Sequence, residues 1–501
     1  MMWMLQFLLY TLLYNLSSVC SSVCPHKCMC EPAAASVQCF RMQSIPSGLP
    51  GDVRKLNLGH NHIKEIKARE LSGLAGLEEV ILSSCGLVQL DGNPFRSQKH
   101  LKSLDLQMNT LRHIPRGLPS SLEILNVGHN QIHTLQESAL HSLRRLRVLN
   151  LQHNLITTVR ANTLSALIKL ESLYLDGNKI ESLQGVLRLP ALNWFSMANN
   201  QIASLPSAFF SSLQLLKTLD LSSNLLSKVP HNLPQALIHL KLDRNQIRSL
   251  KSRDLAQLHD LTTLSACYNR LVSVDGGLRL PGLTVLELAG NQLRVLPSRL
   301  SAKLEKVDCG QNQIQQVTHQ QLSGLRQLKH LFLENNTIQQ LEPNALRDCV
   351  HLTNLALEQN LFSTIPHGLP ESLVRLDLKG NLITTIQERA LMPLKRLQVL
   401  NLRNNRLSSL PAMRLLPRLR ILYLDGNRWN CTCDLLKVKR ELLARDVDLS
   451  TEFCAEPLYS SLDMWQAYIM AEEMCGEQNK EVLPQSHTVK SDSEEYDDYD
   501  F

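Results

Sequence analysis

The chain has 501 residues, of which 20% are charged and only 5% aromatic, while leucine recurs throughout. At roughly 150 residues per domain this length suggests about three globular domains, but the evenness of the leucine pattern argues against a mosaic of unrelated ones. The composition is too apolar for a disordered chain. A net charge of +6 does not by itself indicate binding to nucleic acid.

The N-terminal segment, residues 1–22, carries no charged side chain. Its apolar run from Trp3 to Leu13 is interrupted only by Gln6 and Thr11, which predicts a secretory signal peptide. The alternative is a membrane anchor, but the run is shorter than the about 20 residues that a span needs. No second apolar stretch of that length follows, so we expect a chain secreted into an oxidising compartment, where cysteine pairs persist as disulfides.

The central part of the chain is one repeat in seventeen copies. The template L-x-x-L-x-L-x-x-N fits at Leu101, Leu104, Leu106 and Asn109, and the other copies follow when further apolar residues are allowed at the leucine positions. Consecutive ninth positions are 21, 22 or 24 residues apart. They are Asn61, Cys85, Asn109, Asn130, Asn154, Asn178, Asn200, Asn224, Asn245, Asn269, Asn291, Asn312, Asn336, Asn360, Asn381, Asn405 and Asn427. A fixed template at these spacings is typical of the leucine-rich repeat.

This repeat predicts an α/β solenoid. One short strand per copy would stack in parallel on a concave face, and short helical, 3-10 or extended turns would form the convex face. Leucines at positions 1, 4 and 6 would build one continuous apolar column, so each copy is stabilised by its neighbours. Copies of 24 residues have room for a helical turn, whereas the 21-residue copies contain prolines, as in Ile114–Pro119, that favour extended backbone.

Cysteine clusters flank the repeats, as expected for small caps that cover the open ends of a solenoid. The predicted boundaries are an N-terminal cap at 23–52, the repeats at 53–428, a C-terminal cap at 429–476 and an acidic, disordered tail at 477–501. The clusters comprise Cys24, Cys28, Cys30 and Cys39, and then Cys431, Cys433, Cys454 and Cys475. Zinc binding is the competing interpretation, and the secretory context favours disulfides.

The N-terminal spacing C-x3-C-x-C-x8-C followed by 21- and 24-residue repeats resembles the small leucine-rich proteoglycans, in particular their long podocan- and nephrocan-like members. The resemblance implies an extracellular matrix protein that inhibits transforming growth factor β signalling. It also implies the pairs Cys24–Cys30, Cys28–Cys39, Cys431–Cys454 and Cys433–Cys475. The C-terminal spacing C-x-C-x20-C-x20-C departs from the two-cysteine cap of decorin-like members, so collagen-binding residues of that type are not carried over.

Strand alternation should direct positions 3, 5 and 7 of each copy to the concave solvent. In the seventeen copies these positions hold eleven acidic and six basic residues, and the tail Ser491–Phe501 adds six further acids. The excess of basic residues then lies on the convex side and edges, for example at Arg144, Arg145, Arg147, Lys395 and Arg396. The two surfaces predict a basic protein ligand on the concave face and sulfated glycans on the edges; the alternative is a solvated surface that keeps a long solenoid soluble.

The candidate ligand-binding residues are nine of the eleven concave acids together with four concave aromatics, which can anchor a protein partner. They are Asp105, Tyr174, Asp176, Trp194, Asp220, Asp243, Glu287, Asp308, Phe332, Glu334, Glu358, Tyr423 and Asp425.

Two kinds of modification are predicted. Asn335 and Asn430 begin N-glycosylation sequons. Tyr496 and Tyr499 lie among acids in the tail, a context that favours tyrosine sulfation, with an unmodified solvating tail as the alternative.

The sequence has no H-E-x-x-H, G-x-S-x-G or phosphate-loop motif. We therefore expect no enzyme, no cofactor, no metal, no nucleic acid and no membrane span. Two functions remain: a soluble regulator that binds a growth factor of the transforming growth factor β class or its receptor, or a structural matrix protein that binds collagen or other fibrils.

Overall fold

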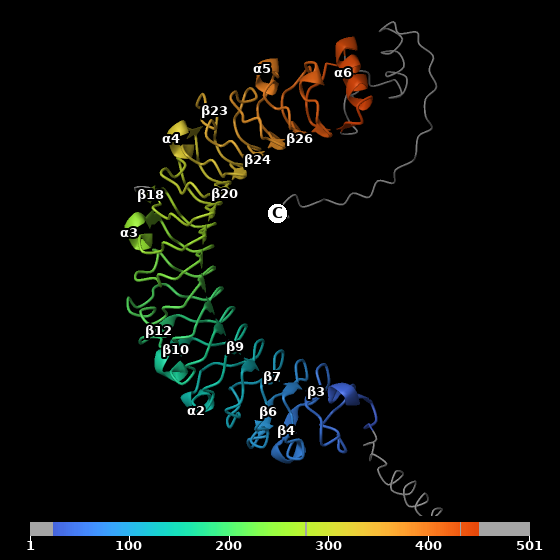
Figure 1. Ribbon diagram of the computed structural model, residues 1–501, viewed down its shortest axis with the longest axis vertical. Coiled ribbons are helices and arrows are strands. Elements are labelled where there is room, and N and C mark those ends of the chain that lie inside the picture. The colour runs from blue at the N-terminus through green and yellow to red at the C-terminus, as the bar shows by residue number, and fades with distance from the viewer. Residues whose placement is uncertain (1–23, 276–277, 431, 450–501) are drawn as a thin grey trace, which may run out of the picture.

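The computed structural model describes residues 24–275, 278–430 and 432–449. These residues form an arc-shaped solenoid with one long sheet on its concave side and short helices outside (Figure 1). The expected signal peptide and the acidic tail, with Tyr496 and Tyr499, lie outside the described residues.

Each repeat contributes one strand, at positions 3 to 5 of the template. The seventeen strands are β3 (Lys55–Asn57), β5 (Glu79–Ile81), β7 (Ser103–Asp105), β8 (Ile124–Asn126), β9 (Val148–Asn150), β11 (Ser172–Tyr174), β13 (Trp194–Ser196), β14 (Thr218–Asp220), β15 (His239–Lys241), β17 (Thr263–Ser265), β19 (Val285–Glu287), β20 (Lys306–Asp308), β22 (His330–Phe332), β24 (Asn354–Ala356), β25 (Arg375–Asp377), β26 (Val399–Asn401) and β27 (Ile421–Tyr423). They pair in parallel and in one register, so that Leu104 lies opposite Leu125 and Leu125 opposite Leu149. The predicted solenoid is confirmed.

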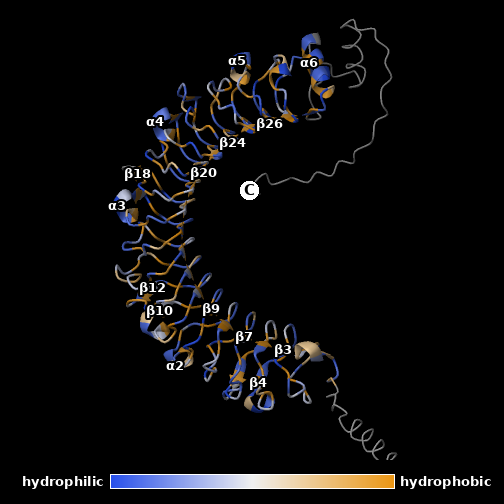
Figure 2. Cartoon of the chain, in the orientation of Figure 1, coloured by the Kyte–Doolittle hydropathy of each residue, from blue (hydrophilic) through white to orange (hydrophobic). Residues whose placement is uncertain are grey.

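The apolar column runs the length of the arc between the two faces (Figure 2). Leu101, Leu104 and Leu106, at positions 1, 4 and 6 of one copy, have no exposed surface. Because each side chain packs on its equivalents in the copies before and after, burial is shared along the whole solenoid.

The asparagine at position 9 ties each copy to the one before it. Asn109 donates from Nδ2 to the carbonyls of Leu82 and Leu106, both at 2.9 Å, and its Oδ1 accepts from the backbone N–H groups of Cys85 and Leu87 at 3.0 and 2.9 Å. Cys85 stands at the equivalent position of the preceding copy, and its thiol donates to the Leu58 carbonyl at 3.0 Å. Buried backbone groups in the turns therefore have partners.

The secondary structure of the convex face depends on the length of each repeat. The single-turn helices α2 (Glu137–Leu140), α3 (Ser252–Leu255), α4 (His319–Leu322) and α5 (Glu388–Leu391) and the 3-10 turns η2 (Ala68–Glu70) and η3 (Ala161–Leu164) all lie in 24-residue copies, and η4 (Met413–Leu415) lies in a 22-residue copy. Just before η2, η3, α3 and α4, the chain forms outer strands that pair in parallel with the next copy. The pairs are β4 (Glu65–Lys67) with β6 (Gln89–Asp91), β10 (Thr158–Arg160) with β12 (Ser182–Gln184), β16 (Ser249–Lys251) with β18 (Ser273–Asp275), and β21 (Gln316–Val317) with β23 (Gln340–Leu341). In the described residues no 21-residue copy contains a helix, as its proline predicts.

The N-terminal cap is an antiparallel hairpin of β1 (Cys28–Glu31) and β2 (Ser36–Cys39), with the 3-10 turn η1 (Pro32–Ala34) between them. Disulfides join Cys24 to Cys30 and Cys28 to Cys39, the two pairs that the family resemblance implies. Strand β2 pairs in parallel with β3 and so continues the concave sheet.

The C-terminal cap places helix α6 (Cys433–Leu443) against the last repeat, and β28 (Asp448–Leu449) pairs with β27. Leu442 is fully buried in the core, and the Arg445 guanidinium donates to the Met413 carbonyl at 3.0 Å. Cys431, Cys454, Cys475 and the side chain of Cys433 lie outside the described part, so the two C-terminal pairs stay predictions.

Candidate functional site: the concave face

An acceptor side chain at position 5 ends many of the concave strands. Asp105 Oδ1 accepts from the backbone N–H of Gln107 at 3.0 Å, and Asn150 Oδ1 accepts from that of Gln152 at the same distance. Four aspartates and four asparagines of the described residues make this bond: Asp105, Asp220, Asp308 and Asp377, and Asn57, Asn126, Asn150 and Asn401. Because a neutral amide makes the same bond, this bond does not require the negative charge.

Two aspartates at position 7 bind the following copy instead. Asp176 accepts from the Ser196 hydroxyl and from the Ala198 N–H at 2.8 Å. Asp243 accepts from the Ser265 hydroxyl at 2.6 Å and from the Cys267 N–H at 2.7 Å. These bonds hold the carboxylates in place on the concave wall.

Partial burial acts on several of these carboxyls. It raises the pKa of Asp105, Asp176 and Asp308 above the usual value, although the hydrogen bonds they accept work in the opposite direction. These three carboxyls therefore bind a proton more readily than fully exposed aspartates do.

Glu334 departs from the expected exposure of position 7. Only 6% of the residue is exposed, and its carboxylate lies over Gly310 of the preceding copy, in the space that a Cβ at residue 310 would fill. The expectation that positions 3, 5 and 7 all face solvent is wrong here, because the missing side chain of Gly310 leaves a slot in the concave wall.

No described residue hydrogen-bonds to Oε2 of Glu334. Burial above all, together with the negative charges of Asp308, Glu358 and Asp377, raises the pKa of this carboxyl to about 7 from its usual 4.5. Four acids from neighbouring strands therefore act on one another at this place in the arc.

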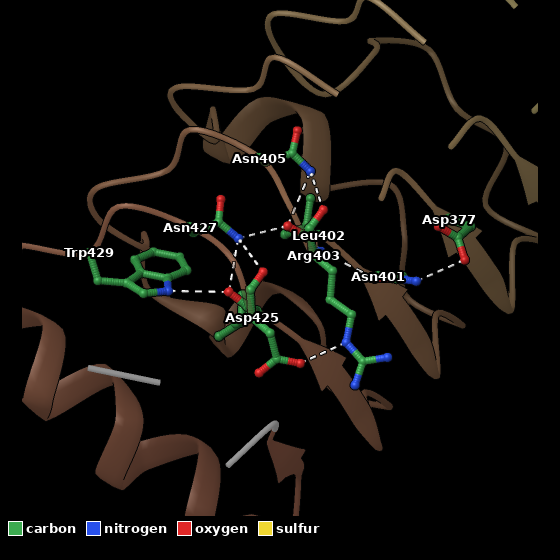
Figure 3. Close-up of polar contacts among 9 residues, drawn as sticks. Asp377, Asn401, Leu402, Arg403, Asn405, Asp425, Asn427 and Trp429 are labelled. Atoms are coloured by element: carbon green, nitrogen blue, oxygen red, sulfur yellow. Dashed lines mark hydrogen bonds and ion pairs between the residues drawn. The ribbon is translucent and has the colours of Figure 1, made fainter. Parts of the chain in front are cut away.

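Three concave acids are neutralised by cations of adjacent copies. Glu79 lies 3.5 Å from Lys55, Glu287 lies 2.9 Å from Lys306, and Asp425 lies 2.7 Å from Arg403. Figure 3 shows the last of these pairs beside the bond from Asn401 to Asp377. Of the predicted ligand-binding acids, Glu287 and Asp425 are thus engaged within the fold.

The four predicted aromatics divide into two kinds. The Lys306 ammonium lies 5.6 Å from the centre of the Phe332 ring, and the Arg403 guanidinium lies 4.2 Å from that of Tyr423. Tyr174 and Trp194 instead contact each other, with ring centres 6.4 Å apart on the adjacent strands β11 and β13. Trp194 is 41% exposed, so this pair is open to a partner.

The concave face therefore contains two distinct stretches. The aromatic stretch, on β8 to β14, consists of Ile124, Tyr174, Asp176, Trp194 and Asp220. The carboxylate stretch, on β20 to β25, consists of Asp308, Glu334, Glu358 and Asp377. The sequence analysis did not include Ile124, which is 43% exposed. Its apolar side chain at position 3, which should face the concave solvent, could have identified it.

The two glycosylation candidates are both exposed in the structure. Asn335 follows Glu334 on the edge where the chain leaves the strand, while its neighbour Asn336 is buried in the asparagine ladder. Asn430 precedes the C-terminal cap. Attachment of a glycan at either residue stays a prediction.

Comparison with known proteins bears on the class of this repeat protein. A leucine-rich-repeat family model matches residues 120–180, 302–362 and 371–428. The chain is 44% identical to nephrocan of Mus musculus over 445 residues, which cover 88% of the chain and 87% of nephrocan. It belongs to the small leucine-rich proteoglycan family. It is also 32% identical to podocan-like protein 1 of Mus musculus, over 74% of the chain and 60% of that protein.

Among solved structures, a chain of the octameric complex of Latrophilin 3, Unc5D and the leucine-rich-repeat protein FLRT2 is 27% identical. The match covers 54% of this chain and 86% of that one, with a TM-score of 0.51. As a small leucine-rich proteoglycan family member the protein is secreted and is not an enzyme. In the described residues no helix is long and apolar enough to cross a membrane.

Proposed function

We propose that this small leucine-rich proteoglycan family member binds a growth factor of the transforming growth factor β class, or its receptor, on its concave face and thereby inhibits signalling. One observation carries the proposal. Aspartate stands at three position-5 sites, Asp105, Asp220 and Asp308, where asparagine makes the same structural hydrogen bond in four other copies. Since this hydrogen bond does not need the negative charge, the three carboxylates support binding of a positively charged ligand.

The aromatic stretch supplies the apolar part of such an interface. Trp194 and Tyr174 offer a large, partly exposed surface with few rotatable bonds, the kind of residue that contributes most to protein binding. Asp176 and Asp220 flank it with carboxylates whose orientation is already set by hydrogen bonds. Little conformational entropy of these side chains is therefore lost when a partner binds to this surface.

The FLRT2-containing complex supports protein binding as the mode of action, because a repeat protein of similar fold occurs there in a multiprotein assembly. Binding to collagen or other fibrils is the alternative function, and it would not depend on a soluble ligand.

The test is a transcription reporter responsive to transforming growth factor β, with purified residues 24–501 added to the medium. The charge variant carries Asp105→Asn, Asp220→Asn and Asp308→Asn, which keeps one acceptor oxygen in each side chain. Its matched control carries Glu137→Gln, Glu181→Gln and Glu388→Gln, three exposed acids away from the concave strands.

We expect the natural chain to inhibit in a dose-dependent way, the charge variant to need at least about tenfold more protein, and the control to match the natural chain. Failure of the natural chain to inhibit at micromolar concentration would refute the regulator function and make fibril binding the next measurement. Equal loss in both variants would mean that net charge, and not the concave face, is responsible.

A further inference from the structure

The edge where the chain enters each strand is electrically balanced. Position 2 of six successive copies alternates in sign: Arg54, Glu78, Lys102, Glu123, Arg147 and Glu171. Glu78 lies 3.1 Å from Arg54 and 2.8 Å from Lys102, and Arg147 lies 2.9 Å from Glu171. Arg147, one of the basic edge residues that the sequence suggested for glycan binding, therefore has a carboxylate partner.

The opposite edge, where the chain leaves the strands, differs over three successive copies. Arg244, Arg248, Arg270 and Arg294 follow β15, β17 and β19 there, and all four are exposed; together they are termed the arginine edge. Their copies are in direct contact, since the Arg270 N–H donates to the Ile247 carbonyl at 2.9 Å and the Gln292 N–H to the Leu271 carbonyl at 2.9 Å. Lys228, in the copy before, is exposed as well.

Three carboxylates of these copies have other partners. Asp243 accepts from Ser265 and Cys267, and Asp254 lies 3.5 Å from His231 Nδ1. Glu287 pairs with Lys306 on the concave face. Within the described part of the chain, none of the ion pairs includes a residue of the arginine edge.

One of the guanidinium groups is held in place without a carboxylate. Arg244 lies over the ring of Tyr268, with its Cζ 5.0 Å from the ring centre, and Tyr268 is itself 46% exposed. A cation–π contact orients the group and leaves its N–H donors free for an anion.

We propose that the arginine edge binds a linear sulfated polysaccharide. Guanidinium groups match the oxygens of sulfate with two parallel hydrogen bonds. The four cations lie on three successive copies, which repeat at about 4.8 Å, so they are spread along an open edge; this suits a chain with anions along its length better than a compact anion. This site goes beyond the proposed function: it lies beside the concave face, so a polysaccharide held there leaves the aromatic stretch open.

The test measures binding of a size-defined heparin octasaccharide to the full chain by calorimetry, and retention on immobilised heparin at several salt concentrations. The edge variant carries Arg244→Gln, Arg248→Gln, Arg270→Gln and Arg294→Gln. The matched control carries Arg54→Gln, Lys102→Gln, Arg147→Gln and Lys329→Gln, which removes the same charge from cations that have carboxylate partners. Thermal unfolding verifies that both variants fold.

We expect the Kd of the edge variant to rise at least tenfold at physiological salt, and the slope of log K against log salt to decrease in magnitude by about one for each arginine lost. The control should stay within about threefold of the natural chain. Tyr268→Ala should weaken binding modestly and Tyr268→Phe should restore it, because phenylalanine keeps the ring face.

Three results would overturn the proposal. One is absence of heparin binding at low salt. Another is an equal loss in the edge variant and the control, which would show a response to net charge alone. The third is equal competition by desulfated heparin or by single-stranded DNA, which would show that sulfate is not what the arginine edge recognises.

Discussion

The aromatic and the carboxylate stretches lie on one continuous sheet and use the same template positions, yet their side chains behave differently. In the aromatic stretch the carboxylates of Asp176 and Asp220 accept backbone hydrogen bonds and Trp194 is left open. In the carboxylate stretch Glu334 is folded into the wall, and the nearby ring of Phe332 lies under Lys306. The difference shows that a concave side chain stays open to solvent only where the neighbouring copies neither cover it nor leave a slot for it.

The largest expected effect is on ligand binding by the aromatic stretch. Trp194→Ala should weaken ligand affinity by about 2–4 kcal/mol, because an exposed tryptophan beside a tyrosine is typical of a binding hot spot. Surface plasmon resonance with the ligand identified by the reporter test measures the change. Phe332→Ala is the control and should cost less than about 1 kcal/mol of affinity, since a cation already covers that ring. Equal losses of ligand affinity in Trp194→Ala and Phe332→Ala would contradict the proposal that only the aromatic stretch binds the ligand.

The next effect concerns stability in the carboxylate stretch. Folding raises the pKa of Glu334 to about 7 from 4.5, so the folded chain binds the proton more tightly than the unfolded chain. This group therefore favours folding most below about pH 4.5, and its contribution is lost as pH rises through about 7. Glu334→Gln should raise the free energy of unfolding at pH 8 by about 1–3 kcal/mol and flatten its decline between pH 5 and 8.

Denaturant unfolding at several pH values measures that difference, with the exposed Glu137→Gln as control. An unchanged pH profile for Glu334→Gln would show that the carboxylate is not held in the slot.

Gly310→Ala also tests whether the Glu334 carboxylate lies in the slot, with a smaller expected effect on stability. The new Cβ occupies the place of the Glu334 carboxylate, a flexible side-chain end that can move outward. We expect a change in unfolding free energy below about 1 kcal/mol and a fall of the Glu334 pKa toward its usual value, measured by NMR titration. A Glu334 pKa that stays near 7 in this variant would show that the slot over Gly310 does not cause the raised pKa.

The smallest effect is expected at the end of the arc. Arg403→Gln removes the ion pair with Asp425 and the cover of Tyr423 (Figure 3). Because the pair is partly exposed, the loss of stability should stay below about 1 kcal/mol, as thermal unfolding would measure. If the Arg403→Gln variant also bound the ligand more tightly, through the uncovered ring of Tyr423, then coverage by a cation would be what keeps an aromatic ring from binding a partner.

The sequence by itself determined the solenoid, the strand positions, the buried leucines and the asparagine ladder, because each follows from a template that repeats along the chain. It also predicted which residues lie on the concave face. Only the tertiary structure decided that Glu334 enters a slot over Gly310, that Tyr174 meets Trp194, and that Arg147 is paired while Arg244 is not. These outcomes depend on contacts between copies of variable length. There the length of one side chain and the space left by its neighbour decide which groups meet. A template that describes one copy at a time contains neither the side-chain length nor that space.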